Sequence, residues 1–225
     1  MNILIIAAHP DDEILGCGGT ITRMAQEQQN VFIAIMGEGI TSRDENLEEE
    51  KNNLKALHSD CHRVAELIGA KDLFLYNLPD NQFDTVPLLN IIKIIENLTK
   101  SIKPEIVYTH HGGDLNIDHI ICHRAVLTAV RPITECSVKQ LYAFEVPSST
   151  DWAFGQLHPI FNPNVFVDVT KTMDIKLKAM SVYKSEIRDF PHPRSLKAIE
   201  SGAARWGAMV GSKYAEAFEL LRMIR

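Results

Sequence analysis

Two clusters of histidine and aspartate residues in this sequence could do metal chemistry, and each directly follows a short apolar run. The first cluster is the segment 8–13, AHPDDE, after the run 3–8. The second is the segment 110–119, HHGGDLNIDH, after the run 105–109. Imidazole nitrogens and carboxylate oxygens are ligands of catalytic zinc, which takes three protein ligands and leaves a fourth position open. The two clusters together therefore predict a metal site.

The spacing favours His9, Asp12 and His119 as the ligand set. His9 and Asp12 lie three residues apart at an expected strand-to-helix junction, where both can hold one cation. His119 adds a second nitrogen from the other cluster. His123, one helical turn further on, is the alternative ligand, although we expect it to lie behind the site or in the core. A structural alternative is that the acidic residues after His9 only complement the positive end of the following helix.

Asp11 is the candidate general base. Adjacent side chains diverge, so Asp11 cannot easily share one ion with Asp12. It is left free to face a water molecule whose pKa a zinc ion lowers to roughly 7. The alternative is that Asp11 only caps a helix.

A parallel α/β sheet would bring the two clusters together, because ligands bind at the carboxyl ends of its strands. Strands are expected at 3–8, 31–36, 73–76 and 105–109. Helices are expected between and after them at 13–29, 44–68, 88–102 and 119–131. Such alternation is typical of βαβ units with helices on both faces of the sheet.

The chain changes character after residue 131. Further strands are expected at 141–146 and 165–169, and further helices at 171–186 and 194–222. The loop 147–163 is long for a compact domain, so we expect it to be functional. We expect a single domain over 1–225, in which 1–131 is the βαβ core and 132–225 holds strands, the active-site loop and the C-terminal helices.

Composition excludes several classes of protein. Of the 225 residues, 45% are hydrophobic and 23% are charged, which is typical of globular proteins. The net charge of −6 argues against a nucleic-acid partner. No apolar run approaches the roughly 20 residues of a membrane span, and the N-terminal run lacks the basic region of a signal peptide. The four dispersed cysteines indicate a reducing compartment, so a cytoplasmic location is expected.

The segment 8–13 after an N-terminal strand, with the later Asp118-His119, resembles the PIG-L/LmbE-like zinc-dependent N-deacetylases. The segments 78–80, LPD, and 214–218, YAEAF, look like further segments of that family. The resemblance implies a Rossmann-like, mainly parallel, three-layer α/β fold. It also implies hydrolysis of an N-acetyl group on an amino sugar or sugar conjugate. His9, Asp12 and His119 would bind one zinc ion, and Asp11 would be the base and then the acid for the leaving amine.

Two positions depart from the family's pattern. Family members often have a histidine where this chain has Asn116, and that histidine helps to stabilise the tetrahedral oxyanion. Asn116, His110 and His111 are the candidates for this role here. An arginine common in the family's Arg-x-x-Glu segment is replaced by Leu57, which leaves the identity of the substrate open.

The sequence thus favours a metal-dependent N-deacetylase that acts on a small-molecule or glycan-precursor substrate. The alternatives are another single-metal amidohydrolase, a phosphoesterase, and a non-catalytic Rossmann-like binding module. A phosphoesterase usually assembles two metals, and the intact Asp11 argues against a module without activity. Flanking loops carry candidate substrate-binding residues, which are Arg43, Asp80, Asp114, Glu145 and Trp152. A homo-oligomer is compatible with the sequence.

Overall fold

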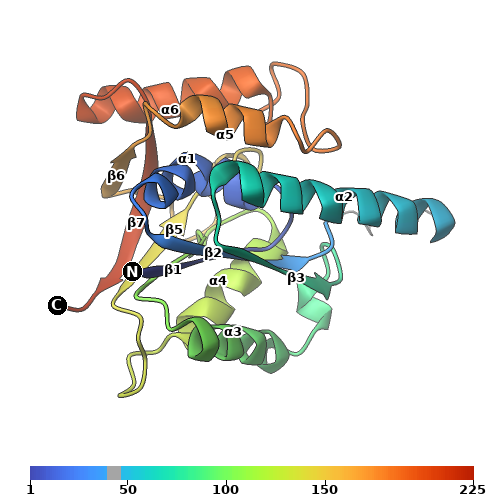
Figure 1. The fold of residues 1–225 in the computed structure, drawn as a ribbon, viewed down its shortest axis with the longest axis vertical. Helices are drawn as coiled ribbons and strands as arrows, with labels where there is room; N and C mark the ends of the chain where they lie inside the picture. The colour runs from blue at the N-terminus through green and yellow to red at the C-terminus, as the bar shows by residue number, and fades with distance from the viewer. Residues whose placement is uncertain (40–46) are drawn as a thin grey trace.

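A computed structural model describes the backbone of residues 1–39 and 47–225, and the side chains of residues 1–39 and 52–225. Within the described ranges, seven strands form one sheet in the order β3-β2-β1-β4-β5-β7-β6 (Figure 1). The strands are β1 (Asn2–Ala7), β2 (Asn30–Gly37), β3 (Asp72–Leu78), β4 (Ile106–His110), β5 (Gln140–Phe144), β6 (Val165–Asp168) and β7 (Ala215–Met223). The strands β1 to β5 pair in parallel, whereas β7 runs antiparallel to both β5 and β6.

Helices cover both faces of this sheet (Figure 1). One face carries α1 (Asp12–Gln26), α2 (Leu47–Ile68), α5 (Met173–Met180) and α6 (Leu196–Val210). The other face carries α3 (Leu88–Ile102) and α4 (Ile117–Ala129). The predicted three-layer, mainly parallel α/β fold is therefore confirmed.

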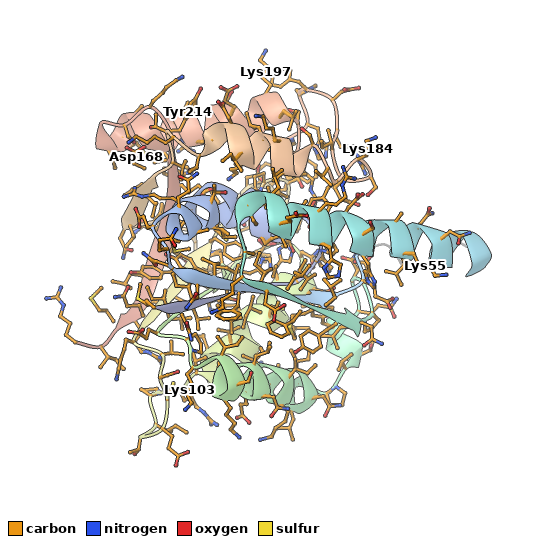
Figure 2. All side chains as sticks on the ribbon, in the orientation of Figure 1. Lys55, Lys103, Asp168, Lys184, Lys197 and Tyr214 are labelled. Atoms are coloured by element: carbon orange, nitrogen blue, oxygen red, sulfur yellow. The ribbon has the colours of Figure 1, made fainter. Side chains whose placement is uncertain are left out.

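Burial explains the sequence pattern of these layers. The β1 residues Ile3 to Ala7 are fully buried because helices cover both sides of the strand, so the run is continuously apolar. On α2, the side chains of Leu57, Cys61, Val64 and Ile68 are buried along one face. Figure 2 shows the side chains packed between the layers, while the exposed Lys55, Lys103, Lys184 and Lys197 project outward.

The C-terminal region differs from the expectation in one respect. The expected helix 194–222 is wrong beyond α6, because α6 ends at Val210 and the chain then forms β7. Gly211 ends the helix in the left-handed region, with φ +77°. The helix expected at 171–186 is also shorter, since α5 ends at Met180. None of the described helices is long and apolar enough to cross a membrane.

The strand β7 also fixes the helix that begins at the predicted site. The helix α1 is broken at Cys17, where φ is −146°. The N–H groups of Gly19 and Thr20 beyond this break donate to the Glu216 carboxylate of β7, at 2.9 and 2.7 Å. Lys176 Nζ lies 2.6 Å from Glu216 Oε1. Glu216 therefore provides acceptors for the two N–H groups beyond the break, and these hydrogen bonds join α1 to the sheet.

Candidate active site

The two predicted clusters meet where the carboxyl ends of the adjacent strands β1 and β4 lie side by side. His9 follows β1, Asp12 begins α1, and His119 lies in the first turn of α4. Nδ1 of His9 lies 3.4 Å from Asp12 Oδ2, and Nε2 of His119 lies 3.2 Å from the same oxygen. All three residues are buried. The structure thus brings together the three residues predicted to bind metal.

Two atoms of this group require a partner. Among the described residues, His119 Nε2 and Asp12 Oδ1 are buried without a hydrogen-bond partner. One ligand atom from each of His9, Asp12 and His119 lies within 4.8 Å of the others. Metal bonds of roughly 2.0–2.2 Å at tetrahedral angles separate ligand atoms by about 3.4 Å. The separations of 3.4 and 3.2 Å between Asp12 Oδ2 and the two histidine nitrogens are close to that value, so the three residues fit one metal ion.

The surroundings of these histidines attract positive charge. Burial lowers the pKa of His9, but the hydrogen bond to Asp118 and the nearby Asp12 and Asp80 raise it to about 10. Burial also lowers the pKa of His119, and Asp12 and the carboxylate of Asp114 raise it to about 9. The same carboxylates also favour a metal cation, which binds the histidines in their deprotonated form.

Carboxylates lie behind both histidines. Asp118 Oδ2 lies 2.9 Å and Asp80 Oδ1 lies 3.4 Å from His9 Nε2. Asp114 Oδ1 lies 3.2 Å from His119 Nδ1. Carboxylates in these positions fix the ring orientation of metal-binding histidines. Asp80 and Asp114, which we predicted to contact substrate, are therefore placed to orient the predicted ligands.

The residues His9, Asp80 and Asp118 form a second group whose ligand atoms lie within 4.8 Å of one another. Both oxygens of Asp118 are engaged, because Oδ2 bonds His9 and Oδ1 accepts the Phe83 N–H at 2.9 Å. The second group is therefore explained by hydrogen bonding that supports His9.

Asp11 precedes α1 in a left-handed backbone conformation, with φ 100°. Its side chain makes no capping hydrogen bond, so helix capping does not explain this residue. Its N–H donates to Glu13 Oε2 at 3.1 Å, and its Oδ2 accepts from Arg194 Nη1 at 3.0 Å. Burial raises the pKa of Asp11 well above its ordinary value, although Arg194 opposes that shift. A buried carboxylate with a raised pKa is suited to proton transfer.

Asn116, a candidate oxyanion donor, is the N-cap of α4. Its Oδ1 accepts the Asp118 N–H at 2.9 Å. Its Nδ2 donates to Asn81 Oδ1 at 3.3 Å. The side-chain oxygen of Asn116 therefore accepts a hydrogen bond from the first turn of α4, the helix that carries His119.

The predicted role of His110 as a charged donor disagrees with its surroundings. His110 Nε2 accepts the Ala8 N–H at 2.8 Å, and the ring stacks on His119 with centroids 4.0 Å apart. Burial, and then the charge of His119, lower the pKa of His110 well below its ordinary value. His110 therefore packs as a neutral ring against a predicted ligand. His111 bonds Glu219 instead, at 2.6 Å, and His123 Nδ1 bonds the His110 carbonyl at 2.8 Å.

Glu145 and Trp152, two other candidate substrate residues, contact the C-terminal part of the chain. Glu145 accepts a hydrogen bond of 2.6 Å from Trp206 Nε1. Trp152 is 41% exposed, and its ring meets the edge of His192. Arg43 lies outside the described residues.

The loop 147–163, which we predicted to be functional, contacts residues beside the predicted metal ligands. The Ser149 hydroxyl donates to Asp114 Oδ1, and the Thr150 hydroxyl donates to Asp114 Oδ2 at 2.6 Å. Further along, His111 Nε2 bonds the Pro159 carbonyl at 2.8 Å. The loop thus fixes the carboxylate that lies behind His119.

Sequence analysis did not identify Arg194 as a site residue, although its guanidinium contacts Asp11. Arg194 lies between α5 and α6, outside any regular element, so no periodicity marks it. Asp118 was recognised only as part of a motif. Its position beside a predicted ligand is the signal that could have given it a role, because metal-binding histidines usually have carboxylate partners.

The chain is similar in sequence to known deacetylases. Residues 4–130 match the family model described as PIG-L, GlcNAc-PI de-N-acetylase. The chain is 32% identical over 192 residues to the uncharacterized deacetylase YaiS of Escherichia coli (strain K12), covering 81% of this chain and 90% of that protein.

Solved structures share the fold. N,N'-diacetylchitobiose deacetylase from Pyrococcus horikoshii has a TM-score of 0.79 at 21% identity, covering 98% of this chain and 84% of that chain. The 4-carboxy-2-hydroxymuconate hydratase from Pseudomonas putida KT2440 also has a TM-score of 0.79, at 17% identity, covering 100% of this chain and 97% of that chain. Because a deacetylase and a hydratase share this fold equally, the fold alone does not define a reaction. The sequence match over residues 4–130 does define the family, and this chain belongs to the PIG-L, or LmbE-like, family of deacetylases.

Proposed function

We propose that this protein is a zinc-dependent hydrolase that removes the N-acetyl group from an amino sugar or sugar conjugate. One observation carries the proposal. In the described part of the chain, His119 Nε2 and Asp12 Oδ1 are buried without a hydrogen-bond partner, and ligand atoms of His9, Asp12 and His119 lie within 4.8 Å of one another. The buried carboxylate of Asp11 is next in sequence to Asp12. A metal site beside an acid–base residue is the arrangement that hydrolysis of an amide needs.

The residues divide the chemistry between them. His9 through Nδ1, His119 through Nε2, and Asp12 would hold one zinc ion, since two histidines and one carboxylate form a known set for catalytic zinc. When bound, the ion polarises the acetamide carbonyl and lowers the pKa of water to about 7. Asp11 takes a proton from the attacking water and returns it to the departing amine.

A second donor to the oxyanion would add to the effect of the metal. His110 Nε2 is an acceptor for the Ala8 N–H, so this atom is not a donor. Asn116 Nδ2, which bonds Asn81 at 3.3 Å, is a further candidate from the predicted set. We therefore retain Asn116 as the candidate donor, and His110, whose Nδ1 is buried without a hydrogen-bond partner among the described residues, as the alternative.

The substrate class follows from family membership. The family model is named for a GlcNAc conjugate, and the Pyrococcus horikoshii enzyme is named for a diacetylated amino-sugar disaccharide. Trp152, which is exposed in the loop 147–163 and whose ring packs against His192, is our candidate for contact with the sugar. The four cysteines are free thiols, which supports a cytoplasmic location.

Acetate release from the metal-loaded enzyme tests this function. The substrates would be N-acetylglucosamine, N,N'-diacetylchitobiose and a GlcNAc glycoside, with a phosphodiester as the alternative substrate. We expect about one zinc ion per chain, acetate release from at least one sugar, and loss of that activity with retained folding after chelation. Phosphodiester cleavage without acetate release would instead identify a phosphoesterase. Purified protein that takes up no metal would support a non-catalytic module.

A further inference from the structure

Arg194 joins the predicted general base to two other segments. Its side chain is 21% exposed, and Nη1 lies 3.0 Å from Asp11 Oδ2 and 3.2 Å from Glu186 Oε2. Its Nε donates to the Ser148 hydroxyl at 2.8 Å. One guanidinium therefore connects the start of α1, the segment after α5, and the loop 147–163.

The Asp11 side chain needs an oppositely charged partner to keep its orientation. Its φ of 100° lies in a region that residues other than glycine seldom adopt. Its side chain is 2% exposed, and the next two residues, Asp12 and Glu13, are also buried acids. Repulsion from these carboxylates would turn the Asp11 side chain away unless an opposite charge held it. Arg194 supplies that charge.

The contacts of Arg194 fix the orientation of its guanidinium. Nε and Nη1 are separate donors of one rigid planar group, and each has its own partner. Because Ser148 holds Nε while Glu186 shares Nη1, the donor that faces Asp11 cannot rotate freely. In the described structure, the partners of Arg194 include none of the proposed metal ligands.

We propose that Arg194 is a positioning residue for Asp11. It holds the Asp11 carboxylate in the orientation from which the base receives a proton and returns it. This inference rests on the proposed deacetylase function. Since Arg194 acts on the base and not on the metal ligands, its loss should change turnover without changing metal content. Misplacing a catalytic group by about 1 Å costs roughly 10²-fold in rate.

The experiment compares Arg194→Ala and Arg194→Lys with Arg188→Ala in the metal-loaded enzyme. Arg188 is the matched control because it lies in the same segment, is exposed, and donates to the carbonyls of Ser185 and Ile187. We expect Arg194→Ala to lower kcat for acetate release by roughly 10²-fold, with KM and zinc content near wild type. Lysine should restore part of the rate, since it keeps the charge but not the planar group.

Chemical rescue separates positioning from general destabilisation. Free guanidinium ion at concentrations below those that unfold the enzyme should raise kcat of Arg194→Ala and leave the wild type unchanged. If Arg194→Ala does not fold, Ser148→Ala serves instead, because it removes only the Nε contact. In that folded variant, kcat should fall several-fold.

Several results would overturn the inference. If the wild type is active and Arg194→Ala has an unchanged kcat, Arg194 does not position Asp11. The same conclusion follows from an unchanged kcat in Ser148→Ala if Arg194→Ala is unfolded. A raised KM with unchanged kcat would assign Arg194 to substrate contact instead. Absence of acetate release by the wild type on every substrate overturns the proposed function, and this inference with it.

Discussion

Asp118 and His9 form a hydrogen bond of 2.9 Å between Oδ2 and Nε2, while the other ring nitrogen of His9 faces Asp12. The second oxygen of Asp118 accepts the backbone N–H of Phe83. Asp118 is therefore fixed at both oxygens, and it fixes the ring of His9 in turn. The orientation of one proposed ligand thus depends on a residue that does not itself face the other ligands.

Replacing Asp118 should weaken metal binding. We expect Asp118→Asn to lower zinc affinity by roughly 10–100-fold, because the imidazole loses its charged partner. Competition with a chromogenic chelator measures the change. Asp84→Asn is the control, since Asp84 is an exposed acid close to Phe83 in sequence. Equal zinc affinities of wild type and Asp118→Asn would contradict a supporting role for Asp118.

Asp11→Asn should retain zinc and lose roughly 10²–10⁴-fold in turnover, because an amide does not accept the proton of water. Asparagine is the suitable substitute, since it tolerates the left-handed backbone of Asp11. Metal analysis and steady-state acetate release measure the two effects separately. Near-normal turnover would exclude Asp11 as the base, and loss of zinc would make it a ligand.

Asn116→Ala should reduce stability, because Asn116 caps α4. Loss of an N-cap side chain costs about 0.5–2 kcal/mol in the free energy of unfolding, and Asn116→Asp should restore most of it. Urea unfolding measures this effect. The same variants test the oxyanion role. If Asn116 is the donor, kcat should fall in Asn116→Ala while KM stays near the wild-type value. Unchanged kcat would leave the residue with its capping role alone.

The His111–Glu219 pair should make stability depend on pH. Burial lowers the pKa of His111, but the bond to Glu219 raises it overall above the ordinary 6.5. A raised folded-state pKa gives stability that is complete below about 6.5 and is lost as pH rises through the folded value. The cost of His111→Asn in urea unfolding should therefore be larger at pH 6 than at pH 9. The exposed His62→Asn is the control. Equal costs of His111→Asn at both pH values would contradict this assignment.

Glu216→Ala should be strongly destabilising. It removes the acceptor for Gly19 and Thr20 and leaves the buried Lys176 ammonium without its carboxylate. Breaking a buried ion pair by removing one partner costs about 3–5 kcal/mol. Urea unfolding should show a loss of that size, against less than about 0.5 kcal/mol for Glu66→Ala on the exposed side of α2. A small effect of Glu216→Ala would mean that another group satisfies the N–H groups beyond the break.

Sequence reasoning located the βαβ core and the metal cluster for a physical reason. Strands buried on both faces must be apolar throughout, as in β1, and such runs stand out from the amphipathic helices between them. His9 and Asp12 come soon after β1, and the polar segment that ends at His119 follows β4, so their meeting at one sheet edge could be anticipated.

The unpredicted features depend on contacts distant in sequence. The segment 215–223, AEAFELLRM, is rich in good helix formers, and only pairing with β5 and β6 makes it a strand. Arg194 reaches Asp11 across 183 positions of the chain, which no local pattern encodes. The same holds for Asp114, whose role follows from where Ser149 and Thr150 hold it.

The place of β7 in the sheet has a consequence for how the chain folds during synthesis. The strand β6 is made before β7, but it pairs only with β7 in the described sheet. A nascent chain can therefore assemble β1 to β5 while β6 still has no neighbour and β5 presents an open edge. Only when residues 215–223 leave the ribosome is the sheet complete, and the same event delivers Glu216 to the broken helix that carries Asp12. We therefore expect the start of α1 to gain its final rigidity late, from a strand that is translated after β1 to β6.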